Sequence, residues 1–223
     1  MDVTPALKSL RRDPRWKPAV TYFKGLKKQN GTKATAATAA FKKAMQGEAP
    51  LVVLDVVMSL RAKYATLAPK LASWHQANPT TTLADFAKSP PKAIAKSAGL
   101  VSAKRQATIK GVAAALLEVG NANDSDWKRL TTWAKDAEAL RYTHTLDSVG
   151  AVKGVGVAAY TYLLMRAGVD TIKPDVRIKE ELVKSGLASS TKALDDHSAL
   201  LLAECMAQEL GVTRLWFDQL LWG

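Results

Sequence analysis

The sequence predicts an all-α protein. Alanine, the strongest helix former, fills segments such as KATAATAAFKKAMQ at 33–46. Amphipathic patterns follow at 102–119 and 124–142, where apolar residues recur with the spacing of one helix face. Strict alternation of apolar and polar residues beside a hairpin turn, which is typical of paired strands, does not occur. We therefore expect helices throughout the chain.

Three further stretches define individual elements. The segment LVVLDVVMSLRAKY at 51–64 begins with β-branched residues that would also suit a buried strand, and its continuation favours a helix. Thr82 and Asp85 have the spacing of helix-capping residues, and the Pro-Pro step at 90–91 must end any helix there. The segment RYTHTLDSVGAV at 141–152 indicates a shorter helix.

Composition gives the first indication of a partner. The net charge is +12, and residues 1–70 hold 14 Lys and Arg against 4 Asp and Glu. Such an excess favours a polyanion, because each neutralised phosphate releases counterions. The single cysteine, Cys205, excludes an internal disulfide and any cluster that needs several thiolates. No run of 18 apolar residues predicts a membrane span, so we expect a cytoplasmic protein without a membrane partner.

Gly154 and Gly156 form the most specific motif, in VKGVG at 152–156. Glycines allow a tight turn and let another backbone come close, and side chains at both positions should block that approach while leaving the fold intact. The helix that follows begins with unpaired amides and a partial positive charge, which suit a phosphate. Val155 is expected to point inward and hold the turn on the core. By itself the glycine pair is also typical of an ordinary turn between packed helices.

Asp175 follows Pro174 and precedes VRIKEEL, so we expect it to cap a helix. Amides at a helix start favour the ionised form of a carboxylate. Asp175 should therefore be charged at neutral pH and able to stabilise a nearby cation or orient a water molecule. A plain capping role is the alternative interpretation.

Together these segments resemble the helix-hairpin-helix DNA glycosylases of the endonuclease III superfamily. The family pattern is Gly-apolar-Gly, a helix and then an aspartate, matched here by VKGVG and by IKPDVRI at 172–178. The likeness extends over residues 48–223 in the order and spacing of its segments. It implies two helical subdomains that carry a helix-hairpin-helix motif, with the active-site cleft between them. The basic helices at 1–47 would pack on this core.

The resemblance also implies roles for individual residues. Asp175 matches the catalytic aspartate, and Arg61 lies in the segment that would fill the gap left by a flipped base. The hairpin residues that would bind the DNA backbone are Lys153, Gly154, Val155, Gly156 and Val157. In the family the hairpin carbonyls often hold a Na⁺ or K⁺ ion, and the matching carbonyls here belong to Gly150, Val152 and Val155. The candidates for lining the base pocket are Tyr160, Tyr162, Trp222 and Asp55.

Two departures from the family pattern indicate which branch of the family the chain resembles. Ala158 stands where bifunctional members carry the lysine that forms a Schiff base with the sugar, so we expect no strand cleavage. The four C-terminal cysteines that hold an iron–sulfur cluster in many members are missing, so we expect no such cofactor. Both point to the monofunctional branch, similar to the 3-methyladenine DNA glycosylases. An alkylated purine is the first choice of lesion, and deaminated or oxidised bases stay open.

The expected protein is a monomeric base excision repair enzyme that acts on double-stranded DNA, and it would be bacterial in type and associated with the nucleoid. It would flip out a damaged base and remove it by hydrolysis. Two alternatives remain at this point. One is a non-catalytic DNA-binding protein of the same fold, and the other is an all-helical protein whose hairpin resemblance is accidental.

Overall fold

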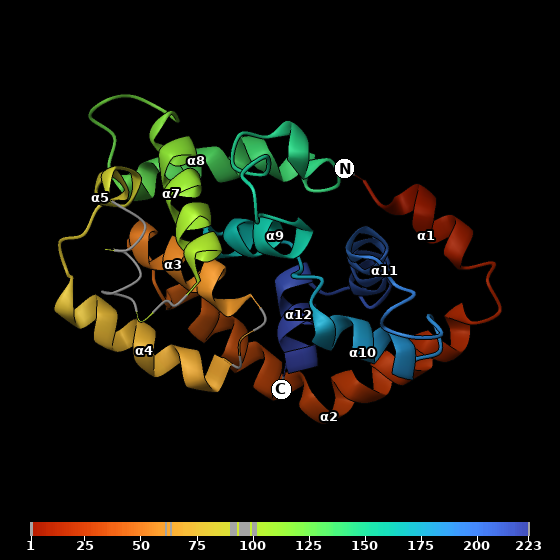
Figure 1. Ribbon diagram of the computed structural model, residues 1–223. Helices are drawn as coiled ribbons and strands as arrows, with labels where there is room; N and C mark the ends of the chain where they lie inside the picture. The colour runs from red at the N-terminus through yellow and green to blue at the C-terminus, as the bar shows by residue number, and fades with distance from the viewer. Residues whose placement is uncertain are drawn as a thin grey trace. The chain divides into compact units, whose positions relative to one another are not determined.

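The computed structural model describes residues 2–60, 62, 64–89, 93, 99 and 102–222. Within these residues every regular element is a helix (Figure 1), which confirms the predicted all-α class. The α-helices are α1 (Thr4–Leu10), α2 (Trp16–Lys43), α3 (Ala49–Ser59), α4 (Tyr64–Ala77), α5 (Leu83–Lys88), α7 (Ala103–Leu117), α8 (Asp126–Ala137), α9 (Val157–Arg166), α10 (Val176–Lys184), α11 (Asp196–Glu209) and α12 (Arg214–Trp222). Two short 3-10 helices, η1 (Glu138–Leu140) and η2 (His144–Leu146), follow α8.

The chain forms two compact units. Unit 1 consists of Met1–Ala44 and Asp170–Gly223, and unit 2 consists of Met45–Val169. The two ends of the chain therefore fold together, with the middle of the chain as a separate body. The expected division into segments 1–47 and 48–223 follows from the family resemblance and not from compactness. It stays a prediction.

Unit 2 is built around α3, which packs against α4, α5, α7, α8 and α9. All residues of α3 are buried, from Ala49 to Ser59. A helix that is buried on every side has no polar face, so its sequence lacks the periodicity that would distinguish it from a buried strand. The structure resolves this ambiguity in favour of the helix. It also confirms the capping residues of α5, where Thr82 and Asp85 exchange hydrogen bonds in a capping box.

Unit 1 joins the helices of the two chain ends, drawn red and blue in Figure 1, with α12 against α2, α10 and α11 and with α1 against α11. Phe23 on α2 and Phe217 on α12 are fully buried and meet edge to face, with ring centroids 5.3 Å apart. This core fixes α12 beside the start of α10, where Asp175 lies. None of the described helices is long and apolar enough to cross a membrane.

Candidate functional site

The turn that precedes α9 begins at Asp147. The carboxylate of Asp147 accepts hydrogen bonds from the amides of Val149 (2.9 Å) and Gly150 (3.0 Å), and the indole of Trp133 on α8 donates to it (3.0 Å). The short helix predicted for residues 141–152 is therefore wrong, since η2 and turns take its place. The physical reason is that an aspartate side chain which binds nearby amides competes with helical hydrogen bonds.

Gly154 is required by the turn itself. Its φ is +100°, a value that residues with a side chain rarely adopt. A Cβ atom at Gly154 would also clash with the hydroxyl of Thr108 on α7, and that hydroxyl donates to the Lys153 carbonyl (2.9 Å). The expectation that side chains at both glycines leave the fold intact is therefore wrong for Gly154.

Gly156 differs from Gly154 in its surroundings. Its φ of −100° suits any residue, and among the described residues no atom lies within 4 Å of a Cβ built there. The fold therefore gives no steric reason for a glycine at this exposed position. Gly156 is the N-cap residue of α9 and has no side chain that could bind the first amides of the helix.

The other hairpin residues divide into buried and exposed ones. Val155 and Val157 are 7% and 4% exposed, so Val155 does point inward as expected. Lys153 is exposed. This arrangement presents backbone and a cation outward on a firmly packed turn, which is what an anion-binding turn requires. The assignment of these residues to DNA binding stays a prediction.

The three carbonyls considered for an alkali ion belong to this turn. A Cβ atom at Gly150 would clash with the carbonyl oxygen of His144, so only glycine lets the two backbones come this close. The Val152 carbonyl accepts a hydrogen bond from the amide of Val155 (2.9 Å), which leaves one lone pair on that oxygen for an ion. Carbonyl oxygens are suitable ligands for a hard cation, and binding of Na⁺ or K⁺ stays a prediction.

Asp175 lies in unit 1 and caps α10, as predicted. Its Oδ1 atom accepts hydrogen bonds from the amides of Arg177 (2.9 Å) and Ile178 (3.3 Å). Burial raises the pKa of Asp175 above the usual range, and the Lys173 ammonium and the two capping amides oppose this shift only in part. The expected effect of the amides is present, but the effect of burial is larger.

A second carboxyl group, that of Asp218 on α12, binds the backbone just before Asp175. Asp218 is 2% exposed, and its Oδ1 atom accepts a hydrogen bond from the backbone amide of Lys173 (3.0 Å). The Gln219 side chain donates to the other carboxyl oxygen (3.1 Å). Burial, together with the negative charge of Asp175, raises the pKa of Asp218 to about 7. The start of α10 thus brings together two carboxyl groups whose pKa values are both raised.

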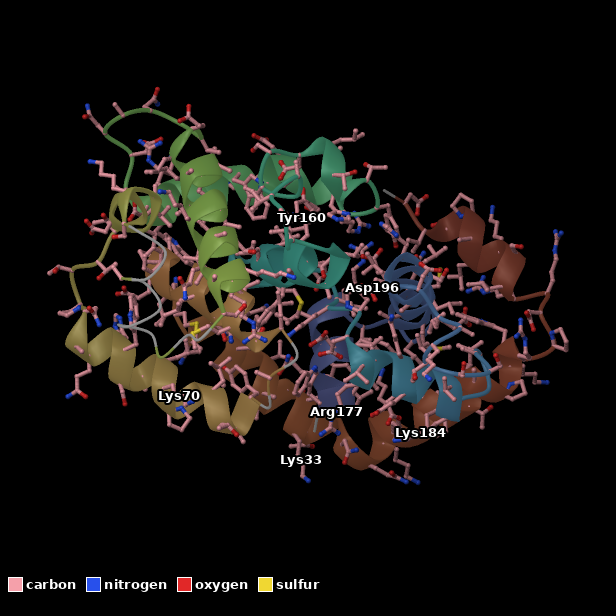
Figure 2. The ribbon with its side chains drawn as sticks, viewed as in Figure 1. Lys33, Lys70, Tyr160, Arg177, Lys184 and Asp196 are labelled. Carbon is pink, nitrogen blue, oxygen red and sulfur yellow. The ribbon has the colours of Figure 1, made fainter. Side chains whose placement is uncertain are left out.

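The base-pocket candidates lie in different surroundings. Tyr160, labelled in Figure 2, is fully buried in unit 2 and its hydroxyl donates to the Ala137 carbonyl (3.1 Å). The Tyr162 hydroxyl donates to Asp55 (2.8 Å), which also pairs with the Arg166 guanidinium (2.9 Å). The structure thus gives Tyr160, Tyr162 and Asp55 contacts in the core of unit 2, and their role in a base pocket stays a prediction.

Trp222 is the exposed member of the candidate set, with 41% of its surface accessible. It ends α12 in unit 1, and the Arg177 guanidinium lies 5.8 Å from the centroid of one of its rings. Trp222 therefore belongs to the same neighbourhood as the start of α10. Arg61, proposed to fill the gap left by a flipped base, lies outside the described residues.

Sequence reasoning did not single out Asp147 or Thr108, which shape the hairpin. Asp147 had a usable signal, because an aspartate three residues before a glycine is typical of a turn. Thr108 had none, since its contact with the Lys153 carbonyl joins residues 45 positions apart. The contact between Asp218 and the Lys173 amide also joins residues 45 positions apart, so spacing does not reveal it.

Comparisons with known proteins agree with this architecture. No protein-family model matches the chain, and no curated protein matches its sequence. Among solved structures, the crystal structure of the 8-oxoguanine DNA glycosylase of Thermotoga maritima is similar over 99% of this chain and 96% of its own, with a TM-score of 0.59 and 16% sequence identity. The chain therefore has the fold of that DNA glycosylase, as its resemblance to the helix-hairpin-helix glycosylases implied.

Proposed function

We propose that this protein is a monofunctional DNA glycosylase, which releases a damaged base from duplex DNA by hydrolysis. The observation that carries the proposal is the fold, because it matches that of a DNA glycosylase over nearly the full length of both chains. The hairpin and Asp175 supply the two chemical groups that such a reaction needs. One group holds the DNA backbone, and the other stabilises positive charge on the sugar.

The hairpin provides the DNA-binding part of the proposal. Gly156 has open space around it, and the amides that begin α9 are suited to a phosphate group. Unit 1 adds basic residues of its own, because α2 carries seven lysines and no acidic residue. Figure 2 shows Lys33 of α2 pointing away from the helices of unit 1. Contacts of this kind position duplex DNA without selecting its sequence.

Asp175 provides the chemical part. A base must leave the helical stack before its glycosidic bond can be reached, which costs roughly a few kcal/mol and less for a damaged base. As the C1′–N bond breaks, positive charge develops on the sugar, and a fixed carboxylate stabilises it. The raised pKa of Asp175 makes the carboxylate a stronger base than an exposed aspartate, which suits removal of a proton from the attacking water.

Ala158 supports hydrolysis without strand cleavage. It lies in the first turn of α9 and has no amine that could attack the sugar. For the substrate we propose a damaged purine. An alkylated purine already carries positive charge and leaves without a strong acid, and the similar structure is that of an 8-oxoguanine glycosylase.

The test is a panel of duplexes, each with one alkylated, oxidised or deaminated base, scored for abasic sites under single-turnover conditions. On any active duplex, Asp175→Asn should lower excision by about 10²-fold or more, the loss typical of one preorganised electrostatic group. Asparagine also caps helices well, so the free energy of unfolding should change by about 1 kcal/mol or less. DNA affinity should hold or rise slightly, because a negative charge is gone.

Asp195→Asn is the matched control for this test. Asp195 is the N-cap residue of α11 in the same unit, and it accepts a hydrogen bond from the Ser198 amide (2.9 Å). Removing its charge should leave excision unchanged. Equal excision by wild type and Asp175→Asn would show that Asp175 is only a cap. Tight DNA binding without release of any base from the panel would favour the non-catalytic alternative.

A further inference from the structure

The backbone that presents Asp175 is a tight turn of three residues. The Asp175 amide donates a hydrogen bond to the Lys173 carbonyl (2.7 Å), which closes the turn around the buried Pro174. Proline limits the backbone angles on one side of the turn, and the cap contacts of Asp175 hold the other. The Lys173 amide, which begins the turn, donates to Asp218 (3.0 Å).

Asp218 is held rigidly where it receives that amide. It lies in the middle of α12, which packs against α2, α10 and α11, and its neighbour Phe217 packs on Phe23. A carboxyl group that is 2% exposed is expensive to bury, so its retention in an apolar helix calls for a specific partner. The Lys173 amide is that partner, because Gln219 is the adjacent residue on the same helix.

We infer that Asp218 is a positioning residue for the reaction at Asp175, because it anchors the Lys173–Asp175 turn and thereby holds the catalytic carboxylate at the start of α10. The reaction itself rests on the proposed function, while the anchoring does not. Positioning needs an oxygen that accepts the Lys173 amide, and it does not need a negative charge.

The charges around Asp218 agree with a role as an acceptor. Burial has the largest effect on Asp218 and raises its pKa. The charge of Asp175 raises this pKa further and Lys173 lowers it, so that the pKa of Asp218 is about 7. Three charged groups on the elements packed against α12 have partners of their own. Arg177 lies over Trp222, Glu204 on α11 pairs with Arg214 (3.5 Å), and Lys27 on α2 lies over Trp216. In neutral solution a large share of Asp218 is therefore protonated and acts through its oxygen.

Substitutions at Asp218 and one control variant separate positioning from general destabilisation. Asp218→Asn keeps an acceptor oxygen for the Lys173 amide, and the Gln219 amide can rotate to face the new NH₂ group. Asp218→Val fills the site without an acceptor, and Asp218→Ala replaces it if the valine variant does not fold. Phe217→Leu is the control, because it weakens the core of unit 1 from the same helix without touching the turn.

The first readout is amide hydrogen exchange, which does not depend on catalysis. In Asp218→Val the amides of Lys173, Arg177 and Ile178 should exchange about tenfold faster or more relative to those of α11, because the turn and the cap loosen together. Asp218→Asn should match the wild type, and Phe217→Leu should speed exchange without preference for these three amides. Unchanged exchange at Arg177 and Ile178 in Asp218→Val would overturn the proposal, as would equal effects of asparagine and valine.

The second readout is single-turnover excision on an active duplex. Asp218→Val should lower the excision rate by about 10- to 100-fold with unchanged DNA affinity, the loss typical of a misplaced catalytic group. Asp218→Asn should stay within about threefold of wild type. Wild-type excision by a folded Asp218→Val variant would overturn the positioning role. If the wild type releases no base, the proposed function fails, and the exchange experiment alone then decides whether Asp218 anchors the turn.

Discussion

A methyl group added at Gly154 should destabilise the protein strongly. The backbone there has φ +100°, a strained value for alanine that costs on the order of 1–3 kcal/mol. The new Cβ would also displace the Thr108 hydroxyl from the Lys153 carbonyl, a hydrogen bond that contributes about 1 kcal/mol. Together these effects suggest a loss of about 3 kcal/mol for Gly154→Ala, which lowers Tm by about 6–12 °C in a chain of this size.

The same methyl group at Gly156 should leave stability nearly unchanged. The φ of −100° suits alanine, and no described atom lies within 4 Å of the new Cβ. Reduced freedom of the unfolded chain stabilises by about 0.4–1 kcal/mol, and the poorer N-cap residue offsets this by a similar amount. The methyl group does stand where a DNA backbone would approach. We expect Gly156→Ala to weaken DNA binding by about tenfold, or about 1.4 kcal/mol.

Thermal melting and fluorescence anisotropy with one labelled duplex, at one salt concentration, measure the two effects. Gly25→Ala on α2 is the matched control for thermal melting, since the described residues leave the space beside it open and its φ is not positive. It shows what a methyl group on an exposed glycine does away from the hairpin. A folded Gly156→Ala variant with wild-type affinity would refute the hairpin as the DNA anchor, and wild-type melting of Gly154→Ala would refute the steric argument.

Three further predictions follow from charge and chemistry. Plotted as log K against log salt, DNA affinity should fall with a slope that corresponds to about 4–8 phosphates, and a flat plot would exclude backbone binding through the basic surface. After base release the DNA strand should stay intact until alkali is added, and borohydride should trap no adduct because Ala158 has no amine. A trapped adduct would identify another lysine as the nucleophile, with Lys153 and Lys173 nearest to the motif. The pKa of Asp218 is raised to about 7 in the folded protein, so its contribution to stability is complete below about pH 4 and is lost as the pH rises through about 7, by at most about 4 kcal/mol. Urea unfolding of Asp218→Asn should lack this decline, and parallel pH profiles of the two proteins would contradict the assignment.

The helical class could be predicted because local signals agree with the fold in most segments. The alanine-rich stretch at 33–46 largely falls within α2, and the Thr82–Asp85 pair caps α5 as its spacing indicated. α3 was the ambiguous element, since burial on all sides removes the periodicity that identifies a helix. Distant parts of the chain decide how far a segment is buried, and a single sequence does not reveal which parts pack against it.

The hairpin is a second case in which contacts from elsewhere in the chain decide the local structure. Residues 141–152 have helical propensity, but Asp147 binds the amides of Val149 and Gly150 and the indole of Trp133. The first two contacts are local and could have been anticipated from the aspartate before the glycine. The third contact comes from Trp133 on α8. It adds a tertiary contact that stabilises the turn, which the two local contacts alone would not fix. Propensity was overridden by one side chain with partners on both sides.

Asp175 combines a local contact that sequence reveals with an environment that it does not. The cap on α10 follows from Pro174 and the helical pattern behind it, and the capping amides favour the charged carboxylate. Burial acts in the opposite direction and is stronger, so the pKa rises instead of falling. A cap that served stability alone would be better exposed to water, where its charge is not penalised. The partly buried cap holds a more basic carboxylate in a fixed place at a cost in stability. The proposed reaction, in which Asp175 would accept a proton beside a developing sugar cation, needs both properties.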